Sequence, residues 1–267
     1  DSLPLKHVTL TEVLKKAGYF NAHLGKWHVG RAEAYPQAHG FHVNIGGTLW
    51  GAPQTFWYPF NGDGYFRDWR YVPGLEPGNK GDYLTDRLTD KALVIMEDQT
   101  KASRPFYLNL WYHSVHTPIE GKPELVERYR KKINPNSVRK NPHYAAMVHS
   151  LDENVGRVLA KIDELRITDN TFVIFTSDNG GFINKCKLNR ELAVANNAPL
   201  RSGKGSCYEG GVRVPLIVRG PEVVQGKISS EPVYAPDLYP TLLRAAGLAD
   251  QAEAGLDGVD FTSLLQN

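Results

Sequence analysis

Long hydrophobic runs and cysteine-rich spacing are both lacking from this sequence. Its apolar stretches are far shorter than the about 20 residues that a membrane-spanning helix needs. The first residues also lack the cationic stretch and apolar core of a signal peptide. The two cysteines, Cys186 and Cys207, are too few for a disulfide framework and have no metal-binding spacing. One bridge and two buried thiols are both compatible with the sequence, so the redox compartment is not defined.

An excess of charge is lacking as well. Lys and Arg total 31 and Asp and Glu total 29, which gives a net charge of +2. This balance argues against nucleic-acid binding driven by bulk charge, although a local cationic pocket for an anionic substrate is compatible with it. Hydrophobic residues make up 41% and charged residues 22% of the 267 residues. That composition and length are typical of one large globular α/β domain.

Helix and strand patterns alternate along the chain. Thr9 and Glu12 form a capping-box pattern for a first helix, which Gly18 ends. Hydrophobic periodicity predicts further elements, namely helices over 83–99, 124–132, 141–165 and 237–246 and strands over 19–24, 106–112, 171–176 and 214–218. The strands at 106–112 and 171–176 are almost continuously apolar, as in strands buried on both faces. The alternation predicts a mostly parallel sheet with helices on both faces.

Residues 35–80 show no clear period and are rich in glycine, proline, asparagine and aromatic residues. A structureless loop of this length is uncommon in a compact domain unless it is functional. We interpret it as an irregular excursion that shapes a substrate pocket. Its candidate pocket wall comprises Trp50, Phe56, Trp57, Tyr58 and Phe60. A structural role as core filler explains these aromatics at least as well.

Two of the predicted strands end in polar residues. In an open α/β sheet, ligands bind beyond the carboxyl ends of the strands. Asp178 and Asn179 offer a carboxylate and an amide oxygen, which suit Ca²⁺ or Mg²⁺. The two glycines that follow make a simple turn the commoner explanation for this tetrapeptide alone. His116 follows the other strand, where an imidazole is suited to be a general acid but is as often structural.

Two glycine-flanked segments add cations. Lys26 and His28 stand two apart between Gly25 and Gly30, and an extended backbone would project both to one side. Lys204 lies in the glycine-rich segment 201–211, which lacks the spacing of a phosphate-binding P-loop. Anion binding and a plain surface loop are equally compatible with that segment. Together these residues give two cations, two imidazoles and a hard-cation site, a set suited to an ester of a strong oxyacid.

These motifs, in this order, resemble the type I, formylglycine-dependent sulfatases. The resemblance covers nearly the whole chain, through Gly18-Tyr19, Gly25-Lys26-Trp27-His28-Val29-Gly30, His116-Thr117-Pro118, Thr176-Ser177-Asp178-Asn179-Gly180, residues 201–211 with Val214-Pro215, and Asp237-Leu238-Tyr239-Pro240-Thr241-Leu242. It implies the alkaline-phosphatase-like α/β sandwich, a sulfuric ester hydrolase activity and a periplasmic or secreted location. The aromatic excursion at 35–80 favours a sulfated carbohydrate as the substrate.

The resemblance also implies roles for the residues that match. Asp178 and Asn179 would be two ligands of Ca²⁺. Lys26 and His28 would hold and activate the hydrated formylglycine nucleophile. His116 and Lys204 would bind the sulfate and assist departure of the alcohol, with His116 as the proton donor. Physically, Ca²⁺ and the two lysines would neutralise charge on the sulfuryl oxygens.

The sequence departs from the family pattern in two respects. The family's N-terminal strand with paired aspartates and its Cys-x-Pro/Ala-x-Arg nucleophile motif are not in the sequence, since neither Cys186 nor Cys207 is followed by the required residues. The smaller C-terminal subdomain is not there either. We therefore expect residues 1–267 to be an incomplete sulfatase catalytic domain, truncated at both ends and by itself almost inactive. A calcium site made from Asp178 and Asn179 alone would be weak, and an N-terminal fragment would have to complete it.

Two alternative functions are compatible with the same residues. One is a phosphodiester or phosphonate hydrolase of the same superfamily, which a serine or threonine nucleophile in place of formylglycine would indicate. The other is a non-catalytic protein that binds sulfated glycans, or a subunit completed by another chain.

Overall fold

The computed structural model describes residues 2–134, 136–187 and 189–266, and its largest sheet is parallel. Strand β1 (Phe20–Gly25) lies in the middle, between β2 (Val43–Ile45) and β3 (Phe106–Trp111), and pairs with each in parallel. A second sheet pairs β4 (Val173–Thr176) with β7 (Leu216–Arg219) in antiparallel orientation. A small hairpin joins β5 (Lys185–Cys186) to β6 (Asn189–Ala193). The predicted α/β class is confirmed, with β7 as an antiparallel addition.

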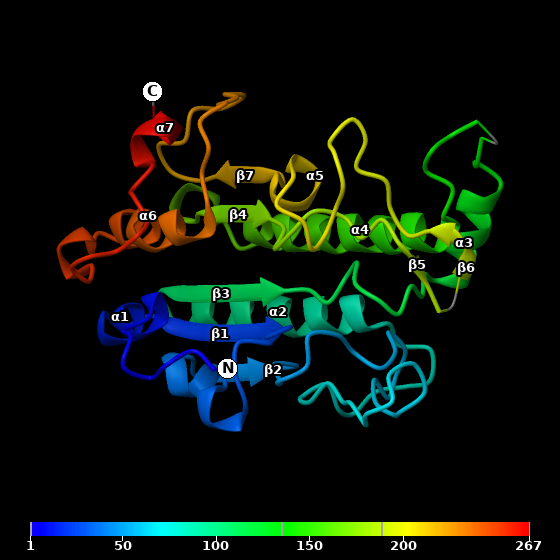
Figure 1. Ribbon diagram of the computed structural model, residues 1–267. Coiled ribbons are helices and arrows are strands. Elements are labelled where there is room, and N and C mark those ends of the chain that lie inside the picture. Colours follow the sequence, from blue (N-terminus) through cyan, green and yellow to red (C-terminus); the bar gives the residue numbers. More distant parts are fainter. Residues whose placement is uncertain (1, 135, 188, 267) are drawn as a thin grey trace.

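Helices cover the two sheets from both sides. Figure 1 shows the long helices behind β1, β3 and β4, and the two helices near the left edge in front of the strands. The α-helices are α1 (Leu10–Lys16), α2 (Leu84–Lys101), α3 (Pro123–Arg130), α4 (Pro142–Glu164), α5 (Glu209–Val212), α6 (Leu238–Ala245) and α7 (Thr262–Gln266). Helix α2 packs on α4, and α1 packs on α6 through Leu14 and Leu243. Within the described residues, no helix is long and apolar enough to cross a membrane.

The local signals explain where the helices begin. Thr9 and Glu12 form the predicted capping box at α1, and Gly18 beyond its end has φ +90°, a left-handed conformation that glycine adopts without a Cβ clash. Asn141 caps α4 by accepting hydrogen bonds from two backbone amides of the first turn. Residues 35–80 are mostly irregular, as predicted, but they contain β2, which the missing period concealed.

The two sheets do not join. In Figure 1, β3 and β4 run side by side in the same direction with a gap between them. Within the described residues β3 pairs only with β1, and β4 pairs only with β7. The gap is a real cavity of about 2210 Å³, lined by both strands and by α4 and α6.

Burial of the strands differs from the prediction for this reason. We expected β3 and β4 to be buried on both faces, but Trp111 is 45% exposed and Phe175 is 36% exposed. Their apolar residues border the cavity between β3 and β4. The sequence pattern therefore indicates more burial than the described residues provide.

Candidate active site

All six predicted site residues line one cavity of about 560 Å³. It lies beyond the carboxyl ends of β1, β3 and β4, the position expected for ligands in an α/β sheet. The six are Lys26, His28, His116, Asp178, Asn179 and Lys204. The Lys26 Nζ atom is 3.4 Å from an Asp178 carboxylate oxygen, which links the β1 side of the cavity to the β4 side. Their chemical roles remain predictions.

The segment after β1 is held by a buried tryptophan. Trp27 packs among His23, Phe41 and Trp111, and its indole N–H donates to the Ala34 carbonyl at 2.8 Å. Its neighbours on either side, Lys26 and His28, line the cavity.

The expected extended backbone at Lys26 and His28 is wrong in detail. His28 has φ +58°, a left-handed conformation, and its amide donates to the Thr48 carbonyl. Gly25 is needed because a Cβ atom there would lie 1.9 Å from the Trp111 carbonyl oxygen. The turn therefore depends on tertiary packing as well as on local sequence.

The segments carrying Asp178 and Lys204 pack against each other. The Gly180 amide donates to the Gly211 carbonyl at 2.9 Å, and the Lys204 amide donates to the Gly181 carbonyl at 3.1 Å. A Cβ atom on Gly180 would lie 1.8 Å from the Gly210 carbonyl oxygen. The glycines of both segments thus permit a close backbone approach that brings Lys204 beside Asp178.

Positive charge and burial set the electrostatics of the cavity. Burial lowers the pKa of His28, and the nearby charges of Lys26 and Lys204 lower it further. Burial likewise lowers the pKa of Lys204, with Lys26 adding to the effect. Mutually repelling cations held in one pocket indicate a site that is stabilised when an anion enters.

His116 is oriented by its neighbour. Its Nδ1 atom lies 3.0 Å from the Thr117 carbonyl oxygen and 3.1 Å from the Thr117 hydroxyl oxygen, so Thr117 engages the Nδ1 side of the ring. The other nitrogen, Nε2, is then the one available to a ligand. Burial lowers the pKa of His116, and the charges of Lys204 and Lys26 lower it further. An anion between the lysines would offset that repulsion and favour the protonated, donating form.

The residues present fit only part of a calcium site. No group of three or more His, Cys, Asp or Glu side chains able to hold a metal occurs within residues 2–134, 136–187 and 189–266. Asp178 and Asn179 supply two side chains, whereas Ca²⁺ takes about six to eight oxygen ligands. The Asn179 amide nitrogen donates to the Gly180 carbonyl, so its side-chain oxygen is not engaged in that bond. These two residues therefore need further ligands to hold the ion.

The long excursion contributes different residues from those predicted. Trp50 lines the cavity, but Phe56 and Phe60 are fully buried in the core. Trp57 and Tyr58 pack against that same core, so the core-filler alternative is correct for all four. Both cysteines are free thiols, Cys186 buried and Cys207 exposed, and neither lines the cavity.

Sequence reasoning missed Phe66 and Arg70, which also line the cavity. Arg70 has its charged group close enough to His28 to lower the pKa of that imidazole. No spacing motif marks either residue. No local signal singles them out, because aromatic and charged residues occur throughout residues 35–80.

Comparisons with known proteins agree with one another. The Sulfatase family model matches residues 1–248. N-acetylgalactosamine-6-sulfatase of Canis lupus familiaris is 31% identical over 275 residues, covering 97% of this chain and 48% of that protein. Arylsulfatase J of Mus musculus is 32% identical over 273 residues, covering 97% of this chain and 42% of that protein.

A solved structure gives the same result. The crystal structure of Ps i-CgsB in complex with k-i-k-neocarrahexaose superposes with a TM-score of 0.80 at 32% identity, covering 97% of this chain and 58% of that chain. This chain spans about half the length of the curated relatives it matches.

Proposed function

The chain belongs to the sulfatase family, and we propose that its cavity is the sulfate-binding half of an active site that hydrolyses a sulfate ester of a carbohydrate. The observation that carries the proposal is the convergence of Lys26, Lys204 and His116 on one cavity at the carboxyl ends of three strands. A sulfuryl group carries its charge on peripheral oxygens, and preorganised cations stabilise that charge as the bond to the alcohol breaks.

Each residue has a separate task in this proposal. Lys26 and Lys204 bind sulfuryl oxygens from the β1 side and the β4 side of the cavity. His116 donates a proton from Nε2 to the departing alcohol oxygen, because its Nδ1 is held by Thr117. His28, with Lys26, orients the nucleophile, which in this family is generally a formylglycine. A carbohydrate substrate is supported by the sulfated-sugar names of the relatives.

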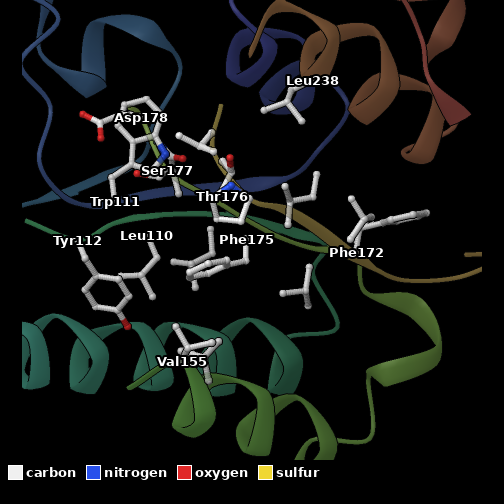
Figure 2. A pocket seen from close by; sticks show the side chains of 18 of the residues that line it. Leu110, Trp111, Tyr112, Val155, Phe172, Phe175, Thr176, Ser177, Asp178 and Leu238 are labelled. Atoms are coloured by element: carbon white, nitrogen blue, oxygen red, sulfur yellow. The ribbon is translucent and has the colours of Figure 1, made fainter. Parts of the chain in front are cut away.

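The cavity between β3 and β4 supports a second part of the proposal, that a β-strand bound there completes the site. Both bordering strands have an unpaired edge within the described residues, and such edges are templates for strand addition. Figure 2 shows Val155 of α4 on one side of this cavity and Leu238 of α6 on the other. A strand between them would be covered on both faces, so its sequence should be apolar throughout.

Such a strand would end beside Asp178. Because β3 and β4 run in the same direction (Figure 1), a strand parallel to both leaves the cavity at the edge where Asp178 and Asn179 follow β4. Its next residues would lie against those two side chains. We propose that this segment supplies the nucleophile and the further oxygen ligands that a calcium ion needs.

A binding experiment tests the strand. A peptide encoded immediately upstream of residue 1 is mixed with the chain, and amide hydrogen exchange of β3 and β4 is followed. We expect slower exchange along both facing edges and a higher unfolding temperature, because the strand pairs both edges. The control peptide carries proline at its centre, which removes a ladder donor. Protection that is absent, or equal with the proline peptide, contradicts the proposal.

An activity assay tests the reaction. The protein expressed from its complete gene is assayed on sulfated sugars and on an aryl sulfate, with the His116→Gln variant as the catalytic control. We expect hydrolysis of a sulfated sugar, lowered by about 10²-fold or more in that variant. Activity on the aryl sulfate alone contradicts a carbohydrate substrate. Binding of sulfated sugars without turnover would instead favour the non-catalytic glycan-binding alternative.

The family resemblance supports a periplasmic or secreted location, which we propose on that basis. Fractionation of the native cells followed by immunodetection tests it. Recovery of the protein only with the cytosolic fraction contradicts it.

A further inference from the structure

We infer that the loop beside the anion cavity carries a carbohydrate subsite, in which Trp50, Asp68 and Arg70 bind adjacent hydroxyl groups of the sugar ring that bears the sulfate. The inference rests on the proposed function in one respect, namely that the sulfate occupies the cavity lined by Lys26 and Lys204. It adds the residues that would distinguish a sugar sulfate from sulfate itself.

An arginine–aspartate pair forms the polar part of this subsite. The Arg70 Nε and Nη2 atoms lie 3.0 and 3.1 Å from the two carboxylate oxygens of Asp68, a bidentate arrangement. The Arg70 Nη1 atom donates to the Ala52 carbonyl at 3.3 Å. A guanidinium has five N–H donors, so two remain for a ligand.

The pair matches a diol better than an anion. The two opposite charges cancel, so the pair adds no net attraction for a second anionic group. It presents N–H donors from Arg70 beside unused lone pairs of Asp68, whose side chain is 51% exposed. A hydroxyl group both donates and accepts, so two adjacent hydroxyls can engage both partners at once.

Aromatic rings border the pair. The Trp50 side chain lies near the Asp68 carboxylate and adds to the lowering of its pKa, which comes first from Arg70. Its ring meets that of Tyr71 edge-on, with centroids 5.1 Å apart. The central carbon of the Arg70 guanidinium lies 3.5 Å from the centroid of the Phe66 ring, a cation–π contact that helps to hold Arg70 in place. Trp50 thus combines an apolar ring, on which a sugar's C–H face can pack, with a polar N–H group near Asp68.

The subsite is continuous with the anion cavity. Trp50, Phe66 and Arg70 line the same cavity as Lys26 and Lys204, and Asp68 adjoins it through its bidentate contact with Arg70 without itself being a lining residue. The residue after Trp50 packs directly on the His28 ring, since a Cβ atom on Gly51 would lie 2.4 Å from His28 Nδ1. A sugar whose sulfate lies between the lysines therefore reaches this loop without leaving the cavity.

One buried side chain holds the loop in place. Gln54 is only 4% exposed, and its amide nitrogen lies 2.8 Å from the Gly62 carbonyl, 3.1 Å from that of Phe66 and 3.2 Å from that of Asp68. Its oxygen accepts a hydrogen bond from the Phe66 amide at 2.6 Å. The loop is therefore fixed before a ligand binds, which lowers the entropy cost of binding.

Titration calorimetry on the 267-residue chain tests the inference with two probes, inorganic sulfate and N-acetylgalactosamine 6-sulfate. The main variant is Asp68→Asn with Arg70→Gln, which removes both charges and so keeps the net charge of the cavity. We expect the wild type to bind the sugar sulfate more tightly than inorganic sulfate. The double variant should lose about tenfold in affinity for the sugar sulfate, about 1.4 kcal/mol, and less than about twofold for inorganic sulfate.

Two tryptophan variants complete the design. Trp50→Ala should reproduce the loss for the sugar sulfate, and Trp50→Phe should recover part of it because a ring is retained. Trp69→Ala is the matched control, because Trp69 belongs to the same loop and is 60% exposed, yet is not among the cavity-lining residues. It should leave both affinities unchanged. Thermal unfolding of each variant shows that the fold is kept.

The outcomes separate the two proposals. Wild-type protein that binds both probes equally, or variants that lose both probes equally, overturn the subsite while leaving sulfate binding intact. Wild-type protein that binds neither probe, with or without the completing peptide, overturns the proposed function, and the subsite with it.

Discussion

The two halves of the molecule differ in how well their strands are enclosed. On the β1 side, Leu24 of β1 and Leu88 of α2 are fully buried in the main core cluster. On the β4 side, Phe175 of β4 and Ile217 of β7 are 36% and 61% exposed. Yet the β4 sequence, Val-Ile-Phe-Thr, is more apolar than that of β1, which includes Asn21 and His23. The difference shows that an apolar strand pattern describes the environment a strand requires, and that the described residues meet this requirement only on the β1 side.

Truncation of a buried side chain gives the largest expected effect. Leu88→Ala should lower the free energy of unfolding by about 3 kcal/mol, through lost burial and the cavity left behind. Phe175→Ala should cost about 1 kcal/mol or less in the same chain, because its ring is already partly in contact with solvent. Urea denaturation of both variants measures the comparison. Equal losses would mean that the two halves are equally packed.

The same pair of variants sharpens the strand proposal. With the completing peptide bound, Phe175 should become buried, and Phe175→Ala should then weaken peptide binding by about tenfold or more. Leu88→Ala, a truncation of a core residue that is remote from the strand edges, should leave peptide affinity unchanged once its lower stability is allowed for. A peptide affinity that is unchanged by Phe175→Ala would mean that the peptide binds elsewhere.

The anion cavity is where the two halves meet, and its two lysines allow a second comparison. Lys26→Ala should weaken sulfate binding by about 10- to 100-fold, since charge-assisted hydrogen bonds contribute about 1.5–3 kcal/mol. Lys204→Ala should cost less, because it leaves Lys26 in place to offset Asp178. Calorimetry with inorganic sulfate measures both. A larger loss of sulfate affinity for Lys204→Ala would mean that Lys204 contributes more to sulfate binding than Lys26 does.

Lowering the pH should destabilise the β1 side of the molecule, which contains the buried histidines His23 and His113. Burial lowers the pKa of His113 to about 3 and that of His23 to about 4. Below the ordinary histidine value of 6.5 the unfolded chain binds protons that the folded chain does not, so stability falls as pH falls. Each histidine should contribute about 1.4 kcal/mol per pH unit between pH 6.5 and its folded-state pKa.

Denaturation at several pH values measures that slope. The His113→Gln variant should lose the His113 share of the slope and keep the share of the other buried histidines, because the amide does not titrate. An unchanged slope in this variant would show that His113 is hydrated or paired in solution.

The sequence predicts most elements because the signals for them are local. The capping pattern at Thr9, the Asn141 cap and the apolar runs at 106–112 and 171–176 depend on neighbouring residues, and each marks an element of the structure. The hairpin β5–β6 and strand β2 were missed, since short strands in irregular segments carry no period.

The same distinction applies to the residues of the site: some have a local sequence signal and others do not. Lys26, His28, His116, Asp178, Asn179 and Lys204 stand in glycine-rich or strand-ending motifs and could be singled out. Arg70 could not, because its place in the cavity depends on the Gln54 hydrogen bonds that fold the loop and on its pairing with Asp68. The position of a loop residue that is held by distant partners is not encoded in its immediate neighbours.

The smallest expected effect tests whether a local signal contributes energy independently of the packing around it. The Thr9 hydroxyl lies 3.4 Å from the Glu12 amide, and the Glu12 carboxylate accepts from the Thr9 amide at 2.8 Å. Thr9→Ala should lower the free energy of unfolding by about 1 kcal/mol, and Thr9→Ser should restore most of it, because serine keeps the accepting oxygen.

Helix α1 packs on α6, which contributes to the cavity between β3 and β4. Because a cap acts within its own helix, the stability lost through Thr9→Ala should be the same with and without the completing peptide. A cost that rises on peptide binding would show that α1 is formed fully only when the second half is enclosed.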